Sequence, residues 1–198
     1  MTTEKHTMSF DEVFSDMRKM WLKAPAGSVS IKVPNARTML YAGLKSVIGE
    51  NAVWLPEYEK VAEWLTDNKG RGLFMFGNCG RGKSLLGRYV LPAIILSCCE
   101  RVVNVFDMQE LNANLDVALS KHLISLDDVG TEEMSVKYGE RRMAFPEIMD
   151  AAEKYGKLVI ISTNLDEVEL RERYGDRILD RIKALTSRIC FNGDSLRR

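Results

Sequence analysis

The chain has 198 residues, enough for one α/β domain with residues to spare. Its 28 basic and 28 acidic side chains leave no net charge, which argues against a protein whose main task is to coat nucleic acid. Four cysteines without a C-x-x-C pair, and only two histidines, argue against a zinc site and a disulfide framework. No signal peptide is visible, and the longest apolar run, Tyr89 to Cys99, is too short to span a bilayer. We therefore expect a cytoplasmic protein with no membrane partner.

An amphipathic helix is predicted near the N-terminus. The segment Ser9-Phe10-Asp11-Glu12 is a capping box, and the apolar residues from Phe10 to Trp21 follow at helical spacing on one face. This face has two interpretations, docking of a partner protein or packing against the rest of the chain. Packing is the commoner outcome for such a face, and we favour it here.

The rest of the chain divides into a linker, two helices and an alternating region. Residues 23–35 contain two prolines and a glycine and are predicted to be a linker. Helices are predicted over residues 36–48 and 56–70. The predicted strands are 72–76, 102–106, 122–127, 158–163 and 187–191. The helices between and around them are 83–99, 108–119, 138–155, 166–173 and 176–185. Such alternation predicts an α/β fold with a five-stranded parallel sheet covered on both faces. The predicted domains are a helical N-terminal region, residues 1–50, and a nucleotide-binding domain, residues 51–198.

The segment from Gly77 to Ser84 fits the phosphate-binding pattern G-x-x-x-x-G-K-[ST] at every fixed position. An apolar strand precedes it and a helix follows, so backbone N–H groups surround an anion at the positive end of the helix dipole. We expect the loop to bind ATP with Mg²⁺, with Lys83 on the β/γ-phosphates and the Ser84 hydroxyl on the metal. The predicted nucleotide contacts are Gly77, Asn78, Cys79, Gly80, Arg81, Gly82, Lys83, Ser84 and Leu85.

Polar residues end two later strands. Asp127 and Asp128 follow a hydrophobic run, and Asn164 follows the next predicted strand. Asp127 is suited to holding Mg²⁺ through its water shell, and Asp128 to polarising the attacking water. Asn164 is suited to orienting that water and sensing the γ-phosphate. Ordinary turn residues are the alternative interpretation. The catalytic one is favoured because ligands of parallel sheets bind at the carboxyl ends of the strands.

Two arginines, Arg177 and Arg181, lie four residues apart on a predicted helix and therefore share a face. One interpretation is surface pairing with neighbouring acidic residues. The other is an arginine finger that neutralises transition-state charge on the ATP of a neighbouring subunit.

These motifs together resemble the DnaC/IstB group of AAA+ ATPases, which comprises replicative-helicase loaders and transposition helper ATPases. The resemblance covers residues 56–198. It rests on the order and spacing of Gly77–Ser84, Leu126–Glu132, Ser162–Leu165, Asp176–Arg181 and Asn192–Arg197. It implies an AAA+-like P-loop fold, Asn164 as the sensor, and Arg181 as a finger acting between self-associated subunits. It also implies a replicative helicase or a transposase as partner, with single-stranded DNA as a further one.

Two features depart from the family pattern. The segment Met108–Ser120 has room for only one helix, whereas such loaders carry an extra helix there to hold single-stranded DNA. No helical lid domain is expected after the last strand, which leaves Arg197 as the only substitute for the lid's sensor arginine.

Three functions stay open. An ATP-hydrolysing loader or helper is favoured. A nucleotide-gated adaptor with weak hydrolysis is compatible with Asp128 in place of the commoner Glu. A P-loop small-molecule kinase is opposed by the acidic pair Asp127–Asp128, by Asn164 and by the lack of an arginine-rich lid segment.

Overall fold

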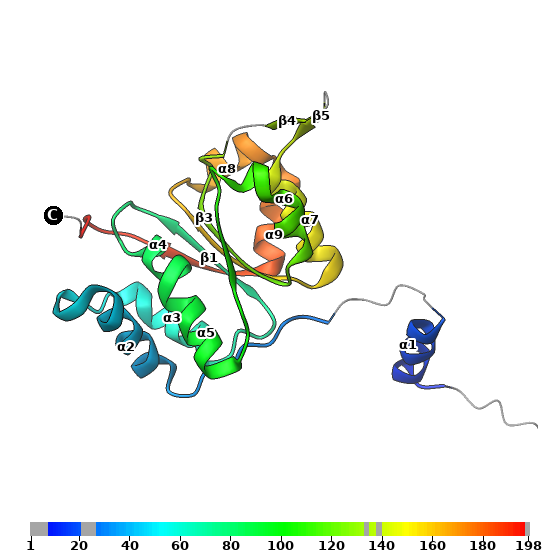
Figure 1. Cartoon of the computed structure of the whole chain (residues 1–198), viewed down its shortest axis with the longest axis horizontal. Helices are drawn as coiled ribbons and strands as arrows, with labels where there is room; N and C mark the ends of the chain where they lie inside the picture. The colour runs from blue at the N-terminus through cyan, green and yellow to red at the C-terminus, as the bar shows by residue number, and fades with distance from the viewer. Residues whose placement is uncertain (1–7, 21–26, 133–134, 138–139, 197–198) are drawn as a thin grey trace, which may run out of the picture.

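Five strands form one parallel sheet at the centre of the fold (Figure 1). The structure is a computed structural model that describes residues 8–20, 27–132, 135–137 and 140–196. The strands of the sheet are β1 (Gly72–Gly77), β2 (Asn104–Asp107), β3 (Leu123–Val129), β6 (Leu158–Thr163) and β7 (Thr186–Phe191). Their order is β2-β3-β6-β1-β7, and every neighbouring pair is parallel. The predicted α/β class and five-stranded sheet are confirmed.

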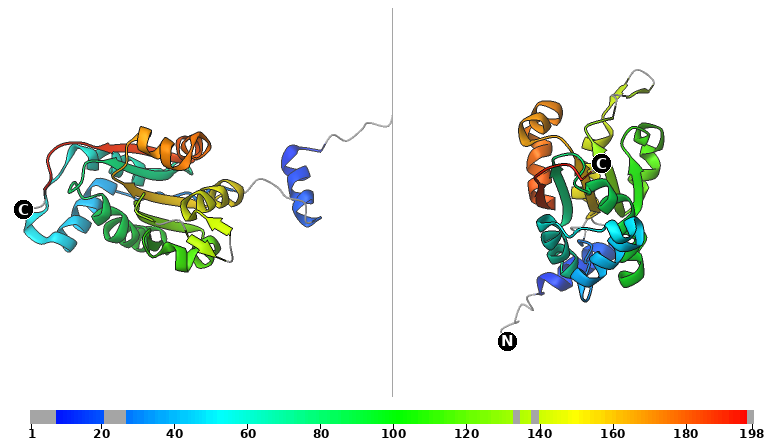
Figure 2. Two further views of the ribbon diagram at one scale, coloured as in Figure 1. Left: turned by 90° about the horizontal axis from the view of Figure 1, so that it is seen from above. Right: turned by 90° about the vertical axis from the view of Figure 1, so that its left-hand side faces the viewer.

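Helices cover both faces of the sheet, as Figure 2 shows from two further directions. They are α2 (Ala36–Ile48), α3 (Pro56–Thr66), α5 (Leu91–Cys99), α6 (Leu111–Ser120), α7 (Ala144–Tyr155), α8 (Glu167–Tyr174) and α9 (Asp176–Leu185), with the short turns η1 (Gly49–Asn51), α4 (Lys83–Leu85) and η2 (Leu86–Val90). Leu73 and Met75 of β1 face a core shared with α2, α3 and α5. Phe74 faces the opposite core, shared with α6 to α9. Successive strand residues enter different cores, which is why the strands have continuous apolar sequences.

The segment before α2 is part of the folded domain. Ile31 and Val33 are buried in the same core as α2 and α3. The N–H of Ile31 donates to Asn68 Oδ1 at 2.8 Å, and the N–H of Val33 donates to the Leu65 carbonyl at 2.9 Å. The linker predicted over residues 23–35 is therefore wrong for this part, and its first four residues lie outside the described chain. The predicted N-terminal region contains a packed portion.

The helix α1 (Phe10–Lys19) begins at the predicted capping box. The N–H of Glu12 donates to Ser9 Oγ at 3.3 Å, and the N–H of Ser9 donates to Glu12 Oε2 at 2.7 Å. No residue of α1 is buried, Phe10 is 82% exposed, and the helix stands apart from the sheet in both figures. The favoured expectation, that this apolar face packs against the core, is not met. Trp21 lies outside the described residues.

The region between β3 and α7 differs from the helix predicted over residues 138–155. Two short antiparallel strands, β4 (Ser135–Lys137) and β5 (Glu140–Arg142), precede α7. The helix begins at Ala144, which places Pro146 in its first turn. Proline has no N–H and is tolerated in the first turn of a helix but not in its interior. Pro146 therefore excludes a helix that begins at residue 138.

Two further expectations concern the segment between β2 and β3 and the segment after β7. A single helix, α6, lies between β2 and β3, as the length of that segment predicts. No helix follows β7 within the described residues, which end at Leu196. Across the described part of the chain, none of the helices has the length and apolar character needed to cross a membrane.

Candidate functional site

The glycine loop joins β1 to α4, η2 and α5, which continue one another over the helix predicted at residues 83–99. Gly77 has φ of 111°, and a Cβ on it would lie 2.6 Å from the carbonyl oxygen of Phe191. Gly82 has φ of 87°, and a Cβ on it would lie 2.3 Å from the Tyr58 hydroxyl. Both the left-handed backbone and the closeness of neighbouring atoms require glycine here. The loop thus has the tight form in which N–H groups can face an anion.

Lys83 is the first residue of α4, and its side chain is buried against the loop. The Lys83 ammonium donates to the carbonyl oxygens of Gly77 and Asn78, each at 2.7 Å. It also donates to Asn164 Oδ1 at 2.9 Å. This position at the loop leaves the charge within reach of phosphate oxygens held by the loop.

The two acidic residues at the end of β3 point to different places. Asp128 has φ of 62°, and the pairing of β3 with β6 shifts register between Leu126 and Val129. Such an irregularity redirects one side chain, and Asp128 lines the cavity beside the loop whereas Asp127 is buried. Asn164 Nδ2 donates to Asp128 Oδ1 at 2.9 Å, so one amide joins the acid to Lys83.

Ser162, on the neighbouring strand β6, contacts both acids and was not assigned a role from the sequence. Its hydroxyl donates to Asp127 Oδ1 and accepts the Asp128 N–H at 3.0 Å. Ser162 is buried and lines the cavity. The sequence signal was its place in Ser162-Thr163-Asn164, two residues before the sensor, where an extended strand puts it on the same face.

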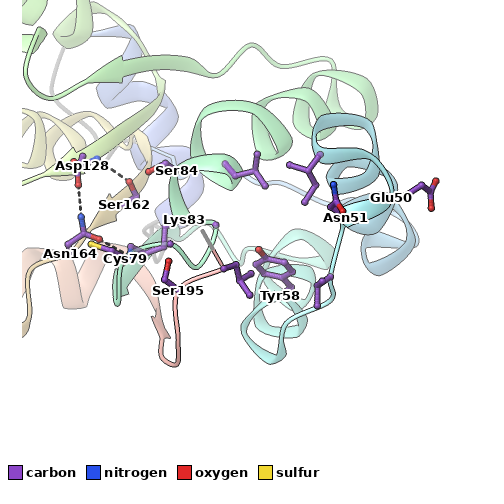
Figure 3. Close-up of a pocket in the computed structure, with 16 residues that line it drawn as sticks. Glu50, Asn51, Tyr58, Cys79, Lys83, Ser84, Asp128, Ser162, Asn164 and Ser195 are labelled. Atoms are coloured by element: carbon purple, nitrogen blue, oxygen red, sulfur yellow. Dashed lines mark hydrogen bonds between the residues drawn. The ribbon is translucent and has the colours of Figure 1, made fainter. Parts of the chain in front are cut away.

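These groups open onto one cavity of about 1140 Å³ (Figure 3). Cavities of roughly 300–1,000 Å³ hold drug-sized ligands, so this one has room for a nucleoside triphosphate. The loop and the strand ends contribute Cys79, Gly80, Gly82, Lys83, Ser84, Leu85, Asp128, Ser162 and Asn164. The far wall and the rim are formed by Ile48, Glu50, Asn51, Val53, Tyr58, Ser195 and Leu196. The structure therefore brings together most of the predicted site residues.

Tyr58 is the main buried residue of the far wall. Its hydroxyl donates to the Arg81 carbonyl at 3.3 Å, and its ring packs against Trp54 and Phe191. Burial, followed by the nearby Glu57 carboxylate, raises the pKa of Tyr58 to about 12, so the phenol keeps its proton at neutral pH. The hydrogen bond joins α3 to the loop, and the ring contact with Phe191 joins α3 to β7.

Arg81 does not line the cavity, although it was predicted among the nucleotide contacts. Its guanidinium forms a buried ion pair with Glu57 at 2.7 Å and donates to the Asp194 carbonyl at 3.4 Å. The segment after β7 is further held by Asn78 Nδ2, which donates to the Gly193 carbonyl at 3.0 Å. Only the backbone of Arg81 therefore remains suited to binding phosphate.

The turn after Asp128 is held by hydrogen bonds of Glu132, one of them with α8. Glu132 is buried, and its carboxylate accepts the Gly130 N–H at 2.8 Å and the hydroxyl of Tyr174 in α8. Burial first, and then the Glu132 contact, raise the pKa of Tyr174, which keeps it a hydrogen-bond donor. Glu132 thereby holds the shape of the acidic turn.

Arg181 is not part of this cluster. It lies on α9, and its Nε donates to Glu153 Oε2 of α7 at 2.7 Å while its guanidinium also pairs with Asp150. Only 12% of the Arg181 side chain is exposed, against 75% for Arg177 one turn earlier. The structure thus favours the surface-pairing geometry for Arg181 within one chain.

The glycine loop and the order of the parallel strands together define an α/β P-loop fold. The sequence matches no protein-family model and no curated protein. Among solved structures, DnaI is similar with a TM-score of 0.55 at 21% identity, over 82% of this chain and 96% of that one. The DnaC helicase loader is similar with a TM-score of 0.53 at 18% identity, over 81% of this chain and 93% of that one. At these identities the likeness shows the fold.

Proposed function

We propose that this chain is an AAA+ ATPase of the helicase-loader type. ATP binding sets an oligomeric state that holds a partner on DNA, and hydrolysis releases the partner. The observation that carries the proposal is the hydrogen-bonded chain from Lys83 through Asn164 to Asp128, inside the cavity of the glycine loop. It supports the joint action of a phosphate-facing cation, a polar sensor and a carboxylate base at one γ-phosphate.

The residues around the loop fit Mg²⁺. Ser84 lines the cavity, and the Asp127 carboxylate at the end of β3 accepts a hydrogen bond from Ser162, which lines the same cavity. Hydroxyl and carboxylate oxygens are the ligands that this cation prefers. When bound, the metal neutralises charge on the β- and γ-phosphate oxygens. The loop N–H groups hold the phosphates, Lys83 faces them, Asn164 orients the water, and Asp128 accepts its proton.

Turnover tests this assignment. Replacing Asp128 by asparagine should slow phosphate release by about a hundredfold or more, because an amide cannot accept the proton of the attacking water. ATP should stay bound, as measured by titration with a fluorescent ATP analogue. Asp127→Asn is the matched control, because it should weaken Mg²⁺-dependent binding instead.

Normal turnover by Asp128→Asn would contradict the assignment. Glu132 is not a ready substitute base, because its carboxylate already accepts hydrogen bonds from Tyr174 and Gly130. Glu133 lies outside the described residues. A wild-type protein that binds ATP but turns over no faster than Asp128→Asn would instead favour the nucleotide-gated adaptor.

The proposed docking segment for the partner is α1. Its apolar residues Phe10, Val13 and Phe14, and Met20 beyond its end, are exposed, yet the helix is capped at its start. An apolar helix face with no buried residue is typical of a protein-binding surface. We propose a replicative helicase as the partner, with a transposase as the alternative.

Deleting residues 1–26 should abolish binding to the purified helicase and leave ATP affinity unchanged. The deletion stops before Ile31 and Val33, which a longer one would remove from the core. Co-elution in size-exclusion chromatography measures the partner, and calorimetry measures ATP. Phe10→Ser with Phe14→Ser is the matched variant in the full chain. Unchanged helicase binding by both would contradict docking through α1, and co-elution with a transposase alone would select the helper function.

A further inference from the structure

Arg88 joins two acidic residues at the carboxyl edge of the sheet. It lies in η2, five residues after Lys83, and was given no role from the sequence. Its Nη1 donates to Asp107 Oδ2 at 2.8 Å and to Asp127 Oδ2 at 3.1 Å. The hydrogen bonds, that to Asp107 first, raise the pKa of the Arg88 guanidinium. Arg88 is thus the shared counter-charge of the acid at the end of β2 and the proposed metal-binding acid of β3.

The backbone around Arg88 has an irregular conformation that is held by a hydrogen bond from β3. Residues 86–90 form a π-helical turn, in which the N–H of Leu91 donates to the carbonyl of Leu86. Turns of this kind are rare and common at functional sites. The Gly87 carbonyl accepts a hydrogen bond from the buried Ser125 hydroxyl at 2.8 Å. Ser125 and Asp127 are two residues apart in β3 and lie on one face of the strand. The same strand therefore binds the backbone of the turn through Ser125 and the Arg88 side chain through Asp127.

Asp127 is held at both carboxylate oxygens. Oδ1 accepts from Ser162, and Oδ2 accepts from Arg88. Asp107 lies directly opposite Asp127 in the register of the parallel strands β2 and β3. Without Arg88, two neighbouring carboxylates would repel each other and offer oxygen ligands to any divalent cation.

We infer that Arg88 is a positioning residue for Asp127. It fixes the orientation of the Asp127 carboxylate at the end of β3 and prevents the Asp107–Asp127 pair from capturing a divalent cation before nucleotide arrives. The inference rests on the proposed function, because it takes Asp127 as the metal-binding acid. With Arg88 in place the three side chains carry a charge of −1, and without it −2.

The test is Mn²⁺ binding by the nucleotide-free full chain, read from the paramagnetic resonance signal of the free ion. Arg88→Gln should bind Mn²⁺ about tenfold more tightly than wild type, because one positive charge is lost beside the two carboxylates. Arg88→Lys should behave as wild type, since it keeps the charge. Adding Asp107→Asn to Arg88→Gln should remove the gain, because the second carboxylate is lost.

Ser125→Ala is the second variant, in case Arg88→Gln does not fold. It removes the hydrogen bond to the Gly87 carbonyl and should increase Mn²⁺ affinity in the same direction by a smaller factor. Thermal unfolding identifies which variants are folded at the assay temperature. The inference is overturned if Arg88→Gln and Ser125→Ala, or whichever of the two folds, bind Mn²⁺ with the affinity of wild type. Because this assay contains no ATP, failure of the wild type to bind ATP would sink the proposed function separately.

Discussion

Replacing Lys83 by alanine is expected to abolish tight ATP binding. The Lys83 ammonium is buried at the loop and donates to Gly77, Asn78 and Asn164. A hydrogen bond to a charged group contributes about 1.5–3 kcal/mol, so the loss of two such bonds to phosphate oxygens lowers affinity roughly a hundredfold or more. Isothermal titration calorimetry with Mg²⁺ and ATP measures the change.

The matched control is Lys60→Ala, because Lys60 is an exposed lysine on α3. It should bind ATP as wild type does. Lys83→Ala also removes the hydrogen bonds from the ammonium to Gly77, Asn78 and Asn164, so its thermal unfolding is measured alongside to separate loss of binding from loss of folding. Equal ATP affinity in folded Lys83→Ala and wild type would refute the nucleotide site.

The sequence was sufficient for the parts of the site that depend on local pattern. The loop motif fixes the strand, the glycine turn and the start of the helix in eight consecutive residues, Gly77 to Ser84. Asp128 and Asn164 could be added because the carboxyl ends of parallel strands meet at one edge. The hydrogen bonds from Asn164 to Asp128 and from Lys83 to Asn164 agree with that argument.

Contacts between distant segments could not be predicted. Tyr58 and the α2–α3 connection line the cavity although they precede Gly77, the first loop residue, by 19 residues or more, and no pattern in them marks a binding wall. The Arg81–Glu57 pair and the Gly193 contact depend on how α3 and the chain after β7 pack. These contacts arise from tertiary packing, which the spacing of residues in the sequence does not predict.

Local backbone irregularities also escaped prediction. The π-helical turn at Arg88 and the left-handed Asp128 both redirect a side chain by a change that regular helix and strand periodicities do not contain. In the other direction, α1 shows that a correct helix assignment does not decide burial. The capping box predicted where α1 begins, but the apolar face has no buried residue.

The second large effect is expected at the interface between subunits. We predict that Arg181→Ala lowers ATP turnover by about 10³-fold or more in assembled protein, as loss of an arginine finger does in well-studied systems. Charge accumulates on the γ-phosphoryl oxygens in the transition state, so a guanidinium placed there acts on rate rather than on binding. A finger acting in trans requires a head-to-tail contact, which builds a ring or a filament. Specific activity should therefore rise with protein concentration.

The geometry of α9 makes the choice of arginine itself testable. Arg181 is largely covered by its pairs with Asp150 and Glu153, whereas Arg177 is exposed on the same helix. To serve a neighbouring subunit, Arg181 has to leave those carboxylates on assembly. Arg177→Ala is therefore the matched control, and it should keep turnover near wild type if Arg181 is the finger.

Mixing two kinds of variant subunit decides whether Arg181 acts on the ATP of a neighbouring subunit or within its own chain. Arg181→Ala subunits keep an intact glycine loop, and Lys83→Ala subunits keep the arginine, so each alone should be inactive. If the arginine acts in trans, mixed interfaces combine one intact loop with one intact arginine and restore part of the phosphate release. A mixture as inactive as its components, or wild-type activity per subunit that stays constant on dilution, would show that Arg181 acts within its own chain or is only a surface ion pair. Arg177→Ala subunits that are inactive alone but regain activity with Lys83→Ala subunits, together with active Arg181→Ala protein, would assign the finger to Arg177.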